Sequence, residues 1–88
     1  MGSYQHPKNL CGRRVKIARV SQEMTQTDLS AALSVDFNIN LSANALSCLE
    51  IGKRTVRDIE LVALAQVLGV TIEWLVLGNK GEPMAPIP

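Results

Sequence analysis

The sequence predicts an all-α fold, a compact domain of five helices, and three observations support this class. Hydrophobic residues make up 47% of the 88 residues, but only Tyr4, Phe37 and Trp74 are aromatic. The core must therefore consist of Leu, Val, Ile and Ala, a composition that suits packed helices. Apolar residues recur at helical spacings, and strand-like alternation is nowhere sustained. A chain of this length forms one domain with a single modest core.

Three segments are expected along the chain. Residues 1–9 are polar and aperiodic, which indicates a flexible N-terminal arm. Residues 10–78 carry the helical patterns and form the domain. Residues 79–88 contain three prolines and are expected to be a flexible tail.

The first helix is expected from about residue 10 to residue 22. Cys11, Val15 and Ala18 lie on one stripe of this helix and are expected in the core. Arg19 lies close to that stripe, where a charged group needs a partner.

A second helix begins after Thr25, a residue type that caps helices. Asp28 follows three positions later, so the pair predicts a capping box. Leu29 and Leu33 then form the buried stripe. Gln26 becomes the first helical residue, where its side chain and the exposed N–H groups suit a phosphate.

Residues 34–41 are expected to be a long connection, although apolar and polar residues alternate within it. No second strand is available for pairing, so the segment is interpreted as a loop that two or three of its apolar residues hold against the core. The alternative for Phe37 is exposure for a partner.

The third helix is expected from the Ser42 cap to about Ile51 and is ended by Gly52. Leu46 and Leu49 lie on its buried stripe. The residues left on the outward face are Ala43, Asn44, Ser47 and Cys48. Together with the preceding helix, this pattern fits either a helix-turn-helix, whose second helix is offered to a DNA groove, or two helices of a small bundle.

Two further helices complete the predicted domain. The fourth is expected from Asp58 to Gly69, and its buried stripe consists of Leu61, Leu64, Ala65 and Leu68. Thr71 caps the short fifth helix, which Gly78 ends.

Charge is unevenly distributed along the chain. Residues 1–57 carry eight Lys and Arg against four Asp and Glu, a net charge of +4, whereas residues 58–88 carry a net charge of −3. The basic part contains the candidate helix-turn-helix, which predicts modest and strongly salt-sensitive attraction to phosphates. The alternative is an ordinary mixed surface.

Other function classes find little support in the sequence. Cys11 and Cys48 lack metal-ligand spacing and are expected to be reduced thiols, and His6 is the only histidine. No carboxylate pair, nucleophile with a histidine, or Gly-rich phosphate loop points to an enzyme, a metal or a cofactor. The absence of a long apolar run or a secretory signal predicts a cytoplasmic protein without a membrane span.

Three segments, MTQTDLSAAL, LSANALSCLEIGKR and DIELVALAQVLGVTIEWL, occur together in this order. In combination they resemble the lambda-repressor-like helix-turn-helix family, also called the xenobiotic-response-element type, over about residues 12–78. Arg54, Val56 and Asp58, with the long connection, resemble a bacterial regulator branch of that family.

The resemblance implies a role for each matching residue. Thr25, Gln26, Lys53 and Arg54 would bind phosphates; Ala43, Asn44, Ser47 and Cys48 would face base edges; Arg19 and Glu50 would form an internal ion pair. This chain departs from the family where Ser30 replaces alanine, its hydroxyl being able to bond to its own helix, and where Ile51 replaces asparagine. The reading face also lacks Arg, Lys and Gln.

The expected function is a sequence-specific transcriptional repressor that binds double-stranded DNA as a homodimer and takes no small-molecule ligand. Trp74, Val76 and Leu77 are the expected dimer contact. The alternative is a protein-interaction module, such as an antitoxin-like adaptor, that uses Phe37 or the Pro-rich tail.

Overall fold

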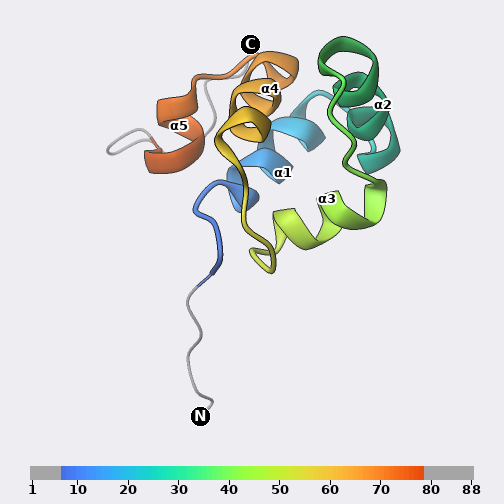
Figure 1. The fold of residues 1–88 in the computed structure, drawn as a ribbon. Helices are drawn as coiled ribbons and strands as arrows, with labels where there is room; N and C mark the ends of the chain where they lie inside the picture. Colours follow the sequence, from blue (N-terminus) through green and yellow to red (C-terminus); the bar gives the residue numbers. More distant parts are fainter. Residues whose placement is uncertain (1–6, 79–88) are drawn as a thin grey trace.

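The computed structural model describes residues 7–78, which form five helices (Figure 1). They are α1 (Gly12–Ser21), α2 (Gln26–Phe37), α3 (Ala43–Glu50), α4 (Asp58–Leu68) and α5 (Ile72–Leu77). Helix α1 packs against α3, α4 and α5, while α4 also packs against α2. Helices α2 and α3 thus lie on one side of the α1–α4 pair and α5 on the other. The predicted all-α, five-helix class is confirmed for the described residues.

The core is built mainly from leucines of α2, α3, α4, α5 and the α2–α3 connection, while α1 contributes Val15 and Ala18. Its buried members are Cys11, Val15, Ala18, Leu29, Leu33, Leu41, Leu46, Leu49, Ala63, Leu64, Ala65, Leu68, Trp74 and Leu75. The predicted apolar stripes point inward, because each helix buries the face on which its apolar residues recur. Leu61 of the predicted α4 stripe is the exception, since it is only half-buried against the core.

Side-chain caps from Thr25, Ser42 and Thr71 fix where α2, α3 and α5 begin. The Thr25 hydroxyl accepts from the Asp28 N–H at 3.0 Å, and the Asp28 carboxylate accepts from the Thr25 N–H at 2.9 Å, which completes the predicted capping box. The Ser42 hydroxyl caps α3 in the same way through the Ala45 N–H, at 3.0 Å. These bonds satisfy N–H groups that have no partner within the helix.

The connection between α2 and α3 is shorter than the sequence indicated, because α2 continues for one more turn to Phe37. Asn38 then adopts the left-handed conformation, with φ of 56°, and ends the helix. Leu41 is buried and Phe37 and Ile39 are half-buried against the core. The sequence favours a loop over residues 34–41 because no second strand is available for pairing, but residues 34–37 belong to α2, and Val35, 82% exposed, lies on the solvent-facing side of that helix.

A hydrogen bond from α2 also holds this connection. The Ser30 hydroxyl donates to the Leu41 carbonyl at 2.6 Å, rather than to its own helix as expected. The serine therefore ties α2 to the residue that immediately precedes the α3 cap.

The ordered fold begins earlier than residue 10, where the sequence placed it. The Lys8 N–H donates to the Gly52 carbonyl at 2.8 Å, and the Asn9 side chain accepts from the Gly12 N–H at 2.7 Å. Residues 7–9 therefore belong to the domain rather than to a flexible arm. The remainder of the expected arm and the expected tail lie outside the described residues.

Candidate nucleic-acid interface

Helix α3 lies along the lower edge of the domain in Figure 1, and its outward residues form the candidate reading face. Asn44 is exposed, and Ala43, Ser47 and Cys48 are half-buried. Leu46 and Leu49 are fully buried on the opposite side. The two leucines hold the helix against α1 and α2, so the reading face remains on the outside of the domain.

The reading face carries few groups that can recognise bases. An asparagine amide can donate and accept at the same time, which matches the N6 and N7 atoms of adenine, and an alanine methyl can contact the methyl group of thymine. Asn44 is the long polar side chain on the face, so it is the strongest candidate for direct base recognition. The half-buried Ser47 and Cys48 offer shorter side chains.

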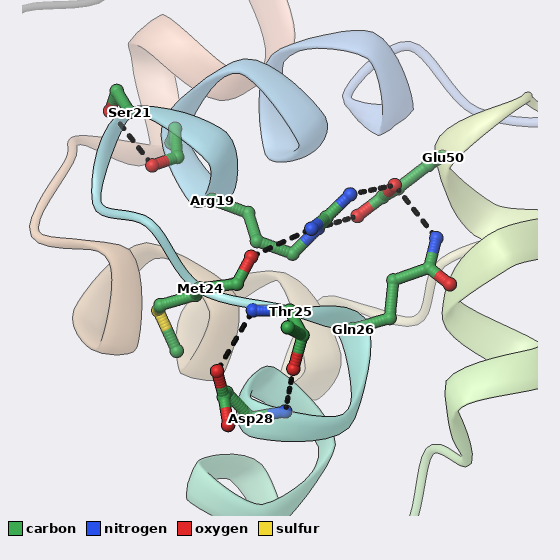
Figure 2. A network of polar contacts seen from close by, with 8 residues as sticks. Arg19, Ser21, Met24, Thr25, Gln26, Asp28 and Glu50 are labelled. Carbon is green, nitrogen blue, oxygen red and sulfur yellow. Dashed lines mark hydrogen bonds and ion pairs between the residues drawn. The ribbon is translucent and has the colours of Figure 1, made fainter.

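A buried polar network fixes the orientation of α3 relative to α1 and α2 (Figure 2). Arg19 is 8% exposed, and it donates through Nε to Glu50 Oε2 at 2.6 Å and through Nη2 to Glu50 Oε1 at 3.0 Å. Its Nη1 donates to the Met24 carbonyl at 2.7 Å. The hydrogen bond with Glu50 raises the pKa of Arg19. Arg19 and Glu50 thus form the internal ion pair that the resemblance implied.

Gln26 joins this network instead of extending freely from the α2 N-terminus. Its Nε2 donates to Glu50 Oε1 at 3.1 Å, and the residue is half-buried (Figure 2). This placement differs from the expected role of the side chain in phosphate binding. No local pattern indicates the Gln26–Glu50 hydrogen bond, because the two residues are 24 positions apart.

The backbone at the α2 N-terminus retains two donors for an anion. The capping box occupies the N–H groups of Thr25 and Asp28, and its hydrogen bonds lower the pKa of Asp28. No hydrogen bond between described residues uses the N–H groups of Gln26 and Thr27. Helix N-termini with such unpaired N–H groups attract phosphates.

The connection between α3 and α4 carries the two predicted phosphate-binding cations, which the structure places differently. Lys53 is exposed, as a phosphate contact requires. Arg54 is half-buried, and its Nη1 lies 3.5 Å from Oε1 of Glu60. Glu60 is 1% exposed and also accepts from the Arg57 N–H at 3.0 Å. Arg54 is therefore directed at a buried carboxylate that the sequence analysis did not single out, although its place three residues after Arg57 matches a capping position.

The predicted dimer contact on α5 is only partly at the surface. Trp74 is 3% exposed and belongs to the monomer core, which corrects its assignment as a contact residue. Val76 is half-buried, whereas Leu77 is 71% exposed. Burial of the indole explains why a short terminal helix docks stably on α1 and α4. Among residues 7–78, none of the helices has the length and hydropathy of a membrane-spanning segment.

Comparisons with known proteins agree with this architecture. The family model described as helix-turn-helix matches residues 15–75. Among solved structures, the chain is similar to the P22 c2 repressor protein, determined in complex with a synthetic operator, with a TM-score of 0.68 and 22% identity over 81% of this chain and 98% of that chain. No curated protein sequence matches. Since the family model spans most of the chain, the protein belongs to the lambda-repressor-like helix-turn-helix family of DNA-binding transcriptional regulators.

Proposed function

We propose that the protein is a sequence-specific transcriptional repressor that binds double-stranded DNA as a homodimer, with α3 of each subunit in the major groove. The observation that carries this proposal is the exposed Asn44 on the outward face of α3. Two phosphate-binding features adjoin that helix, namely the free N–H groups at the start of α2 and the exposed Lys53 after α3. Phosphate contacts of this kind set the register in which a helix meets the bases.

Electrostatics favours the same proposal. Glu50, at the end of α3, is buried and paired with Arg19, so its charge does not repel a phosphate backbone. The net charge of +4 over residues 1–57 supplies the sequence-independent attraction.

Selection from a random duplex pool at two salt concentrations tests base recognition. A dimer selects a symmetric site whose half-sites are about 10 base pairs apart. Asn44→Ala should relax the preference at one position of each half-site by about 1–3 kcal/mol. Lys53→Ala should instead weaken binding to all duplex sequences alike. It should also reduce the slope of log affinity against log salt concentration, the salt slope, by about 1. Lys16→Ala removes the same charge from the exposed surface of α1 and serves as the control.

The dimer is proposed to form through α5, with Leu77 as its main exposed apolar contact and Val76 beside it. Sedimentation should detect a dimer in the unaltered protein. Leu77→Asp should give a folded monomer, because the side chain lies outside the core. A monomeric unaltered protein at high micromolar concentration would reject this assignment.

The alternative is an interaction module or antitoxin-like adaptor with little base recognition. This alternative is supported by the small number of base-recognising side chains on the α3 face, which carries no Arg, Lys or Gln. Phe37 no longer supports it, since that ring packs against the core. Unchanged binding to every DNA pool in both Asn44→Ala and Lys53→Ala would favour the adaptor.

A further inference from the structure

The first described residues of the chain clamp the connection between α3 and α4. The Asn9 side chain donates through Nδ2 to the Leu49 carbonyl at 3.0 Å and to the Arg54 carbonyl at 2.8 Å. The Lys8 N–H donates to the Gly52 carbonyl at 2.8 Å. Three hydrogen bonds from two adjacent residues therefore span the segment that contains Lys53.

The hydrogen-bonding capacity of the Asn9 amide nitrogen is fully used. Both hydrogens of Nδ2 are donated to backbone carbonyls, and Oδ1 accepts from the Gly12 N–H at 2.7 Å. A single side chain thus joins the start of α1, the end of α3 and the α3–α4 connection. A serine or aspartate at this position can accept from Gly12 but cannot donate to both carbonyls.

Close backbone packing shows that this contact is built into the fold. A Cβ atom added to Gly12 would lie 2.2 Å from the Leu49 carbonyl oxygen, so α1 and α3 meet there without an intervening side chain. Gly52 has φ of 80°, and a Cβ atom added to it would lie 3.1 Å from Pro7 Cβ. The N-terminal segment therefore lies directly against the turn that precedes Lys53.

We propose that Asn9 is a positioning residue for DNA-backbone binding, and that Lys8 is an additional phosphate-contacting residue beside Lys53. This inference rests on the proposed DNA-binding function. Asn9 holds the carbonyls on both sides of Lys53, so the lysine reaches a phosphate from a connection that is already ordered. Lys8 is exposed and tied through its own N–H to Gly52, which places a second cation next to the same connection.

The first experiment compares Asn9→Ser and Asn9→Asp with the unaltered protein on the selected duplex. Both variants keep an acceptor for the start of α1, and the aspartate is favourable at a helix N-terminus. We expect both to bind up to about eightfold more weakly at 0.1 M salt, the contribution of one phosphate contact. The amides of Gly52 and Lys53, which donate to the carbonyls of Leu49 and Cys48, should also exchange faster with solvent, which is measured without DNA.

A double-mutant cycle separates positioning from general stability. The effect of Lys53→Ala should shrink in the Asn9→Ser background, because the clamp acts through Lys53. The effect of Asn44→Ala should stay the same in that background, since Asn44 contacts bases from α3. Lys8→Ala should reduce the salt slope by about 0.9 and weaken binding to all duplex sequences equally.

The outcomes distinguish this inference from the function on which it rests. Failure of the unaltered protein to bind any duplex would overturn both. If the unaltered protein binds, then additivity between Asn9→Ser and Lys53→Ala, with full affinity in Asn9→Asp, would overturn only the positioning role. An unchanged salt slope in Lys8→Ala would overturn the additional phosphate contact.

Discussion

The Arg19–Glu50 ion pair should be a dominant polar contribution to the stability of this domain. Replacing Glu50 with leucine leaves the guanidinium in a site where Arg19 is only 8% exposed, with the Met24 carbonyl as its remaining partner. Breaking one partner of a buried pair costs about 3–5 kcal/mol. Because the Met24 contact remains, we expect the lower end, about 3 kcal/mol, lost from the free energy of unfolding. Arg19→Met should cost a similar amount.

The double variant Arg19→Met, Glu50→Leu is the informative one. It removes both charges and fills the site with apolar groups, so it should lie within about 1–2 kcal/mol of the unaltered protein. Urea unfolding followed by far-ultraviolet circular dichroism measures all four proteins. Lys16→Met, on the exposed surface of α1, is the control and should change stability by less than about 0.5 kcal/mol. If the losses of unfolding free energy in the two single variants add up in the double variant, the two side chains do not form a coupled pair.

Three further predictions follow from other contacts. Gly12→Ala should lower the free energy of unfolding by about 2–3 kcal/mol, because its methyl group would meet the Leu49 carbonyl, and a thermal melt equal to that of the unaltered protein would contradict this. Burial raises the pKa of the Cys11 thiol, so iodoacetamide should modify Cys48 first at pH 8, as peptide mass spectrometry would show; equal labelling would count against it. Hydrogen bonds with Thr25 lower the pKa of the Asp28 carboxyl below its ordinary value of 3.8, so its stabilisation is present above pH 3.8 and is lost as the pH falls through the lower folded value. Asp28→Asn should therefore flatten the loss of stability in acid, measured by unfolding between pH 2 and 5, and an unchanged slope would exclude this role.

Local rules explain why the helix positions were predictable. The hydroxyl residues Thr25 and Ser42 act on N–H groups three positions away, and the structure confirms that both cap their helices. Apolar spacing likewise identified the buried faces. The rules failed at the end of α2, where the left-handed Asn38 ends the helix four residues later than expected.

Local sequence rules predicted the candidate site less well than the helices. Exposure of Asn44 and Lys53 agrees with the roles that the resemblance implied, while the roles themselves stay predictions. The resemblance implies a phosphate contact for Arg54, yet its Nη1 lies 3.5 Å from the buried carboxylate of Glu60. The sequence predicts Trp74 at a dimer contact, yet its ring is buried in the monomer core, where α5 packs against α1 and α4.

The sequence by itself determined which segments become helices, where hydroxyl caps begin them and which face of each is apolar, because these properties depend on residues within a few positions. Only the tertiary structure decided that Gln26 turns to Glu50 and that Asn9 holds carbonyls 40 and 45 residues away. Those partners meet only when packing of the apolar faces brings the helix ends together. The arrangement of charges and amides around α3 therefore follows from the fold as a whole.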